Sequence, residues 1–279
     1  MKVKTIDKTI RAKMDEWLST LPPDLAKSIK NEIVVTGGSI ASMLLQENVN
    51  DFDVYFTSAT AASRVAKYYI KSSKLGKGIT TLDHCGADGL YYVTLYRGGN
   101  IISEGENEND TEEEGHSTQE EGKFEVKFLS ENAITLSDKV QIVLRFCGTP
   151  EQIHSSYDFV HATNYWTYNT GVVTNKPALE AILARELIYR GSKYPLASIF
   201  RTRKFIQRGW SMHIGNYVMM AMQLNQLNLN NISVLKEQLT GVDALYLASL
   251  MKAIEQSSED GEVKSVEYVI ELCTRLIGE

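Results

Sequence analysis

Two aspartates, Asp51 and Asp53, stand two positions apart in the segment DFDVYF, where polar and apolar residues alternate. This alternation predicts a β-strand, and side chains two apart on a strand point to the same face. Two adjacent carboxylates repel each other unless a cation lies between them. We therefore expect a hard divalent cation, Mg²⁺ or else Mn²⁺, at this pair. An EF-hand calcium loop beginning at Asp51 is excluded, because its twelfth position would need a glutamate and holds Ala62.

A glycine turn precedes the aspartates. The apolar run 33–35 predicts a short strand, Gly37 and Gly38 break it, and Ser39 is a candidate N-cap for a helix over 40–47. Backbone N–H groups and a hydroxyl at a helix N-terminus form a phosphate site. Nucleotidyl transfer requires a phosphate site beside a two-carboxylate metal site, because the metal activates the attacking oxygen and stabilises the leaving pyrophosphate.

The stretch 37–53, GGSIASMLLQENVNDFD, resembles the head motif of the polymerase-β-type nucleotidyltransferase superfamily. It is most similar to the CCA-adding and poly(A)-polymerase branch, and the chain also resembles phage-encoded nucleotidyltransferase-like proteins. That branch usually carries Arg-Asp early in the helix, where this chain has Ala41-Ser42. The resemblance implies that Gly37, Gly38 and Ser39 bind the nucleotide and that Asp51 and Asp53 are catalytic metal ligands.

The resemblance also implies a third carboxylate on a neighbouring strand. Asp158 and Glu125 both stand between apolar residues, in segments expected to be strands over 157–161 and 123–129. We favour Asp158 as the third catalytic metal ligand, because its aromatic flanks indicate a central strand. Glu125 has Lys127 two residues on as a partner on the same face.

A basic segment lies later in the chain, over 193–210. Arg201 and Lys204 stand three apart, on one face of an expected helix. The segment resembles the Arg-x-x-Arg-Phe segment of CCA-adding and related polymerases, with Lys204 in the place of the second arginine. The resemblance implies that Arg201 and Lys204 help to bind the nucleotide. A cationic helix face can neutralise a triphosphate or follow an RNA backbone, and a solvated basic face is the structural alternative.

The formal net charge is −6, but the chain outside one acidic tract is mildly basic. The tract 103–122 contains nine acidic residues and no Lys or Arg, and outside it 29 basic residues face 26 acidic ones. A nucleic-acid partner is therefore permitted. The tract has almost no apolar residues, so we expect a disordered loop inserted between two strands.

The cellular setting follows from what the chain contains. Its three scattered cysteines, Cys85, Cys147 and Cys273, are typical of a reducing compartment. The first residues have no secretory signal pattern, and no apolar run is long enough to span a bilayer. We expect a cytoplasmic protein without a membrane partner, in the host cytoplasm if a phage encodes it.

The order of expected elements predicts an α+β fold. A mixed-sheet nucleotidyltransferase domain over 1–170 would be followed by an all-α domain over 176–279. The expected function is transfer of a nucleoside monophosphate from an NTP to an acceptor hydroxyl, first of all an RNA (tRNA-like) 3′ end. A protein or small-molecule acceptor stays open. So does a catalytically silent module in a toxin–antitoxin or phage–host pair, as does the oligomeric state.

Overall fold

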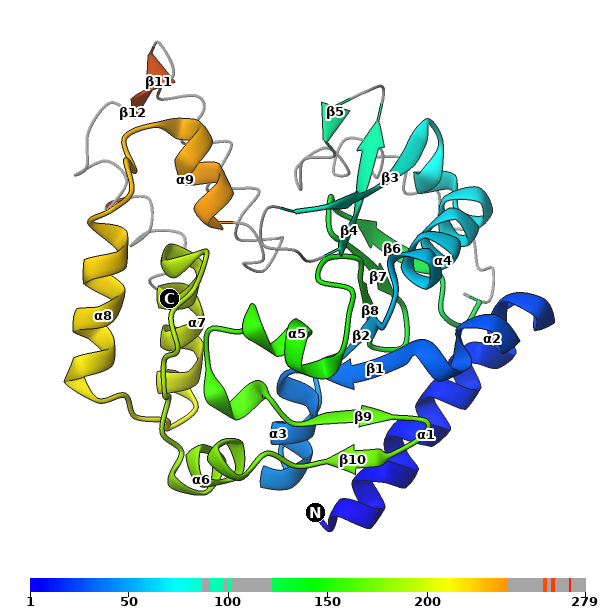
Figure 1. Cartoon of the computed structure of the whole chain (residues 1–279), viewed down its shortest axis with the longest axis horizontal. Coiled ribbons are helices and arrows are strands. Elements are labelled where there is room, and N and C mark those ends of the chain that lie inside the picture. The colour runs from blue at the N-terminus through cyan, green and yellow to red at the C-terminus, as the bar shows by residue number, and fades with distance from the viewer. Residues whose placement is uncertain are drawn as a thin grey trace, which may run out of the picture. The chain divides into compact units, whose positions relative to one another are not determined.

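The chain divides into two compact units. The first comprises Met1–Ser156 and His161–Ile182, and the second comprises Tyr157–Val160 and Leu183–Glu279. The computed structural model (Figure 1) describes residues 1–86, 91–97, 100–101, 122–239, 258–259, 262–263 and 271. The expected disorder of the acidic tract and the helices expected beyond residue 239 lie outside the described residues, apart from Gly122 in the tract.

A seven-stranded mixed sheet forms the centre of the first unit. Its strand order is β10-β9-β1-β2-β8-β7-β6, and only the β2–β8 pair is parallel. The strands are β1 (Ile33–Thr36), β2 (Phe52–Phe56), β6 (Val126–Leu129), β7 (Ala133–Leu136), β8 (Val140–Val143), β9 (Tyr165–Thr167) and β10 (Gly171–Val173). A three-stranded antiparallel sheet contains β3 (Ile79–Cys85), β4 (Tyr91–Arg97) and β5 (Asn100–Ile101). The predicted α+β fold class, a mixed sheet followed by helices, is confirmed.

The helices described in the first unit are α1 (Val3–Ser19), α2 (Pro23–Ile29), α3 (Gly38–Leu45), α4 (Ala59–Ser72), α5 (Pro150–Ser155) and α6 (Lys176–Ala184), whose last two residues belong to the second unit. Strands of this unit are contacted by α1, α3 and α4. On α1 the side chains of Ile6, Ile10, Met14 and Trp17 recur every three or four residues and are all buried. This spacing places them on one face of the helix, which joins the hydrophobic core.

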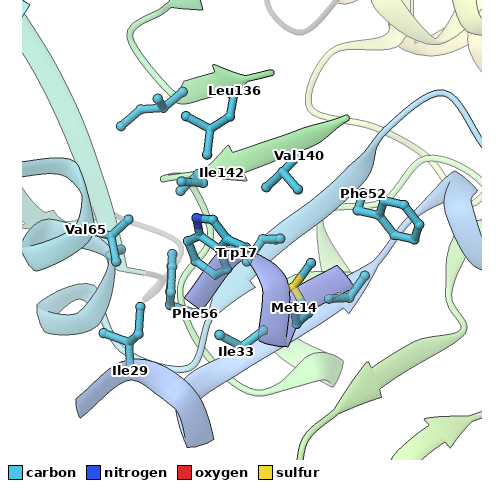
Figure 2. Packing of buried hydrophobic residues seen from close by; sticks show 14 of the residues in the cluster. Met14, Trp17, Ile29, Ile33, Phe52, Phe56, Val65, Leu136, Val140 and Ile142 are labelled. Atoms are coloured by element: carbon cyan, nitrogen blue, oxygen red, sulfur yellow. The ribbon is translucent and has the colours of Figure 1, made fainter. Parts of the chain in front are cut away.

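Figure 2 shows how the core closes around Trp17, with Met14, Ile33 and Phe56 nearby. The Trp17 indole Nε1 donates a hydrogen bond of 2.8 Å to the Tyr69 hydroxyl of α4. The polar tips of both rings are therefore satisfied inside the core. Burial raises the pKa of Tyr69 well above its usual range, so the hydroxyl remains protonated.

One segment differs from the sequence expectation. The strand expected over 157–161 is wrong: Phe159 forms a single bridge with Tyr189, and 160–162 form a short 3₁₀ helix. On the side of β1 away from β2, the pairing strand is β9, whose Trp166 is fully buried in the core. Helix α6 ends at Ala184, because Arg185 takes a left-handed conformation with φ of 50°.

The second unit contains α7 (Pro195–Gln207), α8 (Ile214–Leu224) and α9 (Ile232–Leu239), with α7 in contact with the other two. The strands described in this unit are β11 (Ser258–Glu259) and β12 (Glu262–Val263). Aromatic rings pack in this unit, with centroid distances of 5.8 Å for Phe159–Tyr189, 6.4 Å for Phe159–Phe205 and 5.3 Å for Phe205–Trp210. Within the described parts of the chain, no helix is long and apolar enough to cross a membrane.

Candidate functional site

The two aspartates lie where β2 begins. Asp53 is on β2 and partly buried, while Asp51 is exposed just before the strand. Phe52 and Val54 are buried in the hydrophobic core. Since successive side chains of a strand point to opposite faces, Asp53 lies on the face away from that core. The predicted strand is confirmed over Phe52–Phe56, and the shared face of Asp51 and Asp53 stays a prediction.

The Asp53 carboxylate packs directly against the glycine turn. Gly37 has a φ of +88°, and a Cβ built on it would lie 2.6 Å from Asp53 Oδ2. Glycine is required here for two reasons: the backbone conformation is one that side chains rarely adopt, and the carboxylate occupies the space of a methyl group. The turn and the carboxylate therefore form one site.

The helix after the turn offers donors to an anion. Gly38 and Ser39 are the first two residues of α3, where a helix leaves backbone N–H groups without intrahelical acceptors. The expectation that Ser39 is the N-cap is wrong, because Gly37 takes that position and donates its N–H to the Ala162 carbonyl at 3.2 Å. Ser39 is buried, and its Oγ has no hydrogen-bond partner among the described residues. A buried hydroxyl without a hydrogen bond costs free energy, and an acceptor oxygen from a ligand would supply the missing bond.

A buried hydrogen-bond network holds the residue before the turn. Thr36 Oγ1 lies 2.8 Å from His154 Nε2, 2.9 Å from the Asn164 carbonyl and 3.3 Å from the Ala162 carbonyl. A carbonyl can only accept, so we assign the single Thr36 hydroxyl proton to a carbonyl and a proton to His154 Nε2. Sequence reasoning missed this network, although the Thr149–Gln152 capping box that starts α5 is readable in the sequence.

On the sheet face that carries Asp53, one row of residues is polar. Strand register aligns Tyr165, Thr36, Asp53, Gln141 and Thr135 in one row on β9, β1, β2, β8 and β7. Register partners point to the same face of a sheet. Burial raises the pKa of Tyr165. We call these five residues the polar row.

The adjacent row contains Trp166, Val35, Val54, Ile142 and Ile134, and it is apolar. All five side chains are fully buried in the hydrophobic core. The two rows thus differ: the apolar row packs into the core, whereas the polar row includes Asp53 and Gln141, which are partly exposed.

The residues present fit a divalent metal in their chemistry. The carboxylates of Asp53 on β2 and of Asp51, two residues earlier, are oxygen donors of the kind that Mg²⁺ prefers. Within the described ranges, no group of three or more His, Cys, Asp or Glu side chains is placed to hold a metal ion. Glu125 lies just before β6, with β7 and β8 between that strand and β2, and its Oε1 accepts from the Gly122 N–H at 3.1 Å.

Asp158 and Arg201, for which the sequence predicts separate roles, contact each other within the second unit. Asp158 Oδ2 accepts from Arg201 Nη1 at 2.5 Å and from Ser198 Oγ at 2.9 Å. Lys204 is exposed on the same helix, α7. A metal-binding role for Asp158 stays a prediction, as does nucleotide binding by Arg201 and Lys204.

A sequence profile described as "Gabija anti-defense 2 family protein" matches residues 8–185, more than half of the chain. The chain belongs to this family. The matched residues include the glycine turn, both aspartates and all seven strands of the mixed sheet. A relative from Bacillus phage SPbetaL7, named Gabija anti-defense 2, is 21% identical over 244 residues. Those residues are 86% of this chain and 49% of the relative, so the chain spans about half the length of that phage protein.

Solved structures that the chain is similar to include a tRNA-processing enzyme with CTP and a Thermotoga maritima CCA-adding enzyme complexed with tRNA. The first has a TM-score of 0.41 and 12% identity, with 91% of this chain and 55% of that chain covered. The second has the same TM-score and identity, with 95% and 71% covered. Likenesses below a TM-score of 0.5 say nothing about activity or ligands.

Proposed function

We propose that the first unit is a metal-dependent nucleotidyltransferase that moves a nucleoside monophosphate from an NTP to an acceptor hydroxyl. The observation that carries the proposal is the contact between the Asp53 carboxylate and Gly37, at the start of a helix with unsatisfied donors. One glycine turn thus joins a metal-binding carboxylate to a phosphate site. That combination is what transfer of a nucleotidyl group needs.

Each residue of the site has a role in this proposal. Asp51 and Asp53 hold the metal, Mg²⁺ or Mn²⁺, by their carboxylates. Gly38 and Ser39 bind the triphosphate by backbone N–H groups and the Ser39 hydroxyl. When bound, the metal would polarise the phosphate and stabilise the leaving pyrophosphate. Thr36 and His154 keep the turn in place through their buried hydrogen bonds.

The acceptor we favour is an RNA 3′ end. Between residues 185 and 208 the sequence holds seven Lys or Arg residues and one acidic residue. A basic segment of this kind favours a polyanionic partner. Arg201 and Lys204 belong to this segment, and we propose that they contact phosphate groups of the nucleotide or of the RNA.

The family name supports a second candidate from another class. The phage relative is named for anti-defence against Gabija, which fits an interaction between phage and host. In this alternative the chain is a binding module of that anti-defence, and the glycine turn and aspartates hold a nucleotide without turnover. A protein of the host would then be the partner.

A labelling experiment tests the proposal. The purified chain is incubated with each NTP labelled at the α-phosphate, Mg²⁺ or Mn²⁺, and total RNA with protein extract. Asp53→Asn is compared with Asp83→Asn, which removes an exposed carboxylate from β3. We expect label in RNA with the parent chain and with Asp83→Asn, and a loss of at least about 100-fold with Asp53→Asn.

Each other outcome redirects the proposal. Label in a protein band would identify a protein acceptor. Metal–NTP binding that depends on Asp53 without transfer would favour the binding module. The proposal would be overturned if the parent chain did not bind metal–NTP, or if Asp53→Asn bound it equally strongly.

A further inference from the structure

Asp53 has two neighbours within the polar row. On one side β1 places Thr36 opposite it, and on the other side β8 places Gln141 beside it in parallel register. β1 and β8 are the strands that flank β2 in the sheet. Any group that shares a ligand with Asp53 from a neighbouring strand of this sheet would come from one of these two positions.

The two neighbours differ in what they have to offer. Thr36 is completely buried, and its hydroxyl is occupied by His154 and the Asn164 and Ala162 carbonyls. Gln141 is partly exposed, and its side chain shares a face with Asp53. An amide oxygen is a hard, neutral donor that Mg²⁺ and Mn²⁺ accept as a ligand. Gln141 is thus the neighbour that can face a ligand.

We infer that Gln141 forms the third corner of the metal site, so that two carboxylates and one neutral amide oxygen surround the cation. The inference rests on the proposed function. It differs from the sequence expectation, in which a third carboxylate, Asp158, completed the site. The net charge contributed by the three ligands is then −2, which balances one divalent cation.

An amide in the place of a third carboxylate affects how the proton of the acceptor hydroxyl is removed. In nucleotidyl transfer the acceptor oxygen forms a bond to the α-phosphorus, the bond from that phosphorus to pyrophosphate breaks, and the acceptor hydroxyl loses its proton. A carboxylate beside the metal can accept that proton as a general base. The Gln141 amide cannot, so Asp51, Asp53 or water must accept the proton. With an amide in place of a third carboxylate, transfer should be slower than in the same site with glutamate at position 141.

Two substitutions at this position test the inference in opposite directions. Mn²⁺ binding to the chain is measured by electron paramagnetic resonance with a non-hydrolysable ATP analogue, and transfer is measured in parallel. Gln141→Leu removes the amide at similar volume and should weaken Mn²⁺ binding roughly tenfold. Gln141→Glu adds a charge and a base, and should tighten Mn²⁺ binding roughly tenfold and raise the transfer rate at least about tenfold.

The matched control is Thr135→Val, which removes a polar group from the same row one strand further from Asp53. It should leave Mn²⁺ binding and transfer unchanged. An unchanged Mn²⁺ affinity in both Gln141 variants would overturn the inference. If Gln141→Leu fails to fold, Gln141→Glu alone decides, because its shape is that of glutamine. Asp53→Asn distinguishes failure of the proposed function from failure of the Gln141 inference. If Asp53→Asn leaves Mn²⁺ binding intact, the proposed function fails. If Asp53→Asn abolishes Mn²⁺ binding and neither Gln141 variant changes it, only the role of Gln141 is removed.

Discussion

At the scale of single residues, Gly37 is the position where backbone conformation and chemistry meet. Its positive φ lets the chain turn from β1 into α3, and its missing side chain makes room for the Asp53 carboxylate. The neighbouring Gly38 has open space around its Cα, so its part in the site is its N–H and not the lack of a side chain. The two glycines of the motif therefore contribute to the site in different ways.

Gly37→Ala should weaken metal binding as well as folding. The new methyl would lie 2.6 Å from Asp53 Oδ2 and push the carboxylate aside, and the backbone at φ of +88° and ψ of −152° would add strain of about 1–3 kcal/mol. We expect Mn²⁺ binding to weaken roughly tenfold, since the carboxylate must rotate away. Gly78→Ala is the matched control, because Gly78 has a φ of +76° and no atoms within 4 Å of the new methyl. Equal Mn²⁺ affinities in the two variants, measured by calorimetry, would contradict this account.

At the scale of elements, the site depends on the contact of α5 with β1 and β9. His154 comes from α5, Thr36 ends β1, and Asn164 immediately precedes β9. All three residues are buried. Their hydrogen bonds connect a short helix and two strands at the point where β1 turns into α3.

Thr36→Val should destabilise the first unit by about 1–3 kcal/mol, because it leaves the buried His154 Nε2–H and the Asn164 carbonyl without the hydroxyl. Thr36→Ser keeps the hydroxyl and should recover most of that loss. Urea unfolding followed by circular dichroism measures both variants. If serine, which keeps the hydroxyl and loses only the methyl, is destabilised as much as valine, this account of the hydroxyl is contradicted.

At the scale of the whole molecule, the two units have separate cores and separate polar clusters. The first unit contains the mixed sheet with Asp51 and Asp53, and the second contains the Asp158–Arg201 ion pair. Residues 157–160 leave the first unit, add Asp158 and Phe159 to the second, and the chain returns at His161. A single pass along the sequence does not reveal this excursion of four residues.

Asp158→Ala should loosen the second unit and leave the metal site unchanged. Arg201 and Ser198 lose their shared acceptor, which we expect to cost about 1–3 kcal/mol. Hydrogen exchange should accelerate in peptides from residues 183–211 and stay constant in β1 and β2. Asp83→Ala, an exposed position on β3, provides the control. A fall in Mn²⁺ affinity with Asp158→Ala would instead support the metal-ligand role expected from the sequence.

Local patterns in the sequence determined the centre of the site. The strand at 33–36, the glycine turn, the helix after it and the strand with Asp53 could all be predicted, because each depends on neighbours within a few residues. The alternation of Asp51, Phe52, Asp53 and Val54 likewise determined which side chains enter the core. On α1 the apolar side chains that form the buried face likewise recur at a helical spacing that the sequence contains.

The tertiary structure alone decided which residues stand beside Asp53. Gln141 follows it by 88 positions along the chain and reaches the same row only through the parallel β2–β8 register. His154 meets Thr36 across 118 positions, and Asp158 meets Arg201 across 43. Strand order and register result from how whole elements bury their apolar faces together, and no short stretch of sequence contains that information.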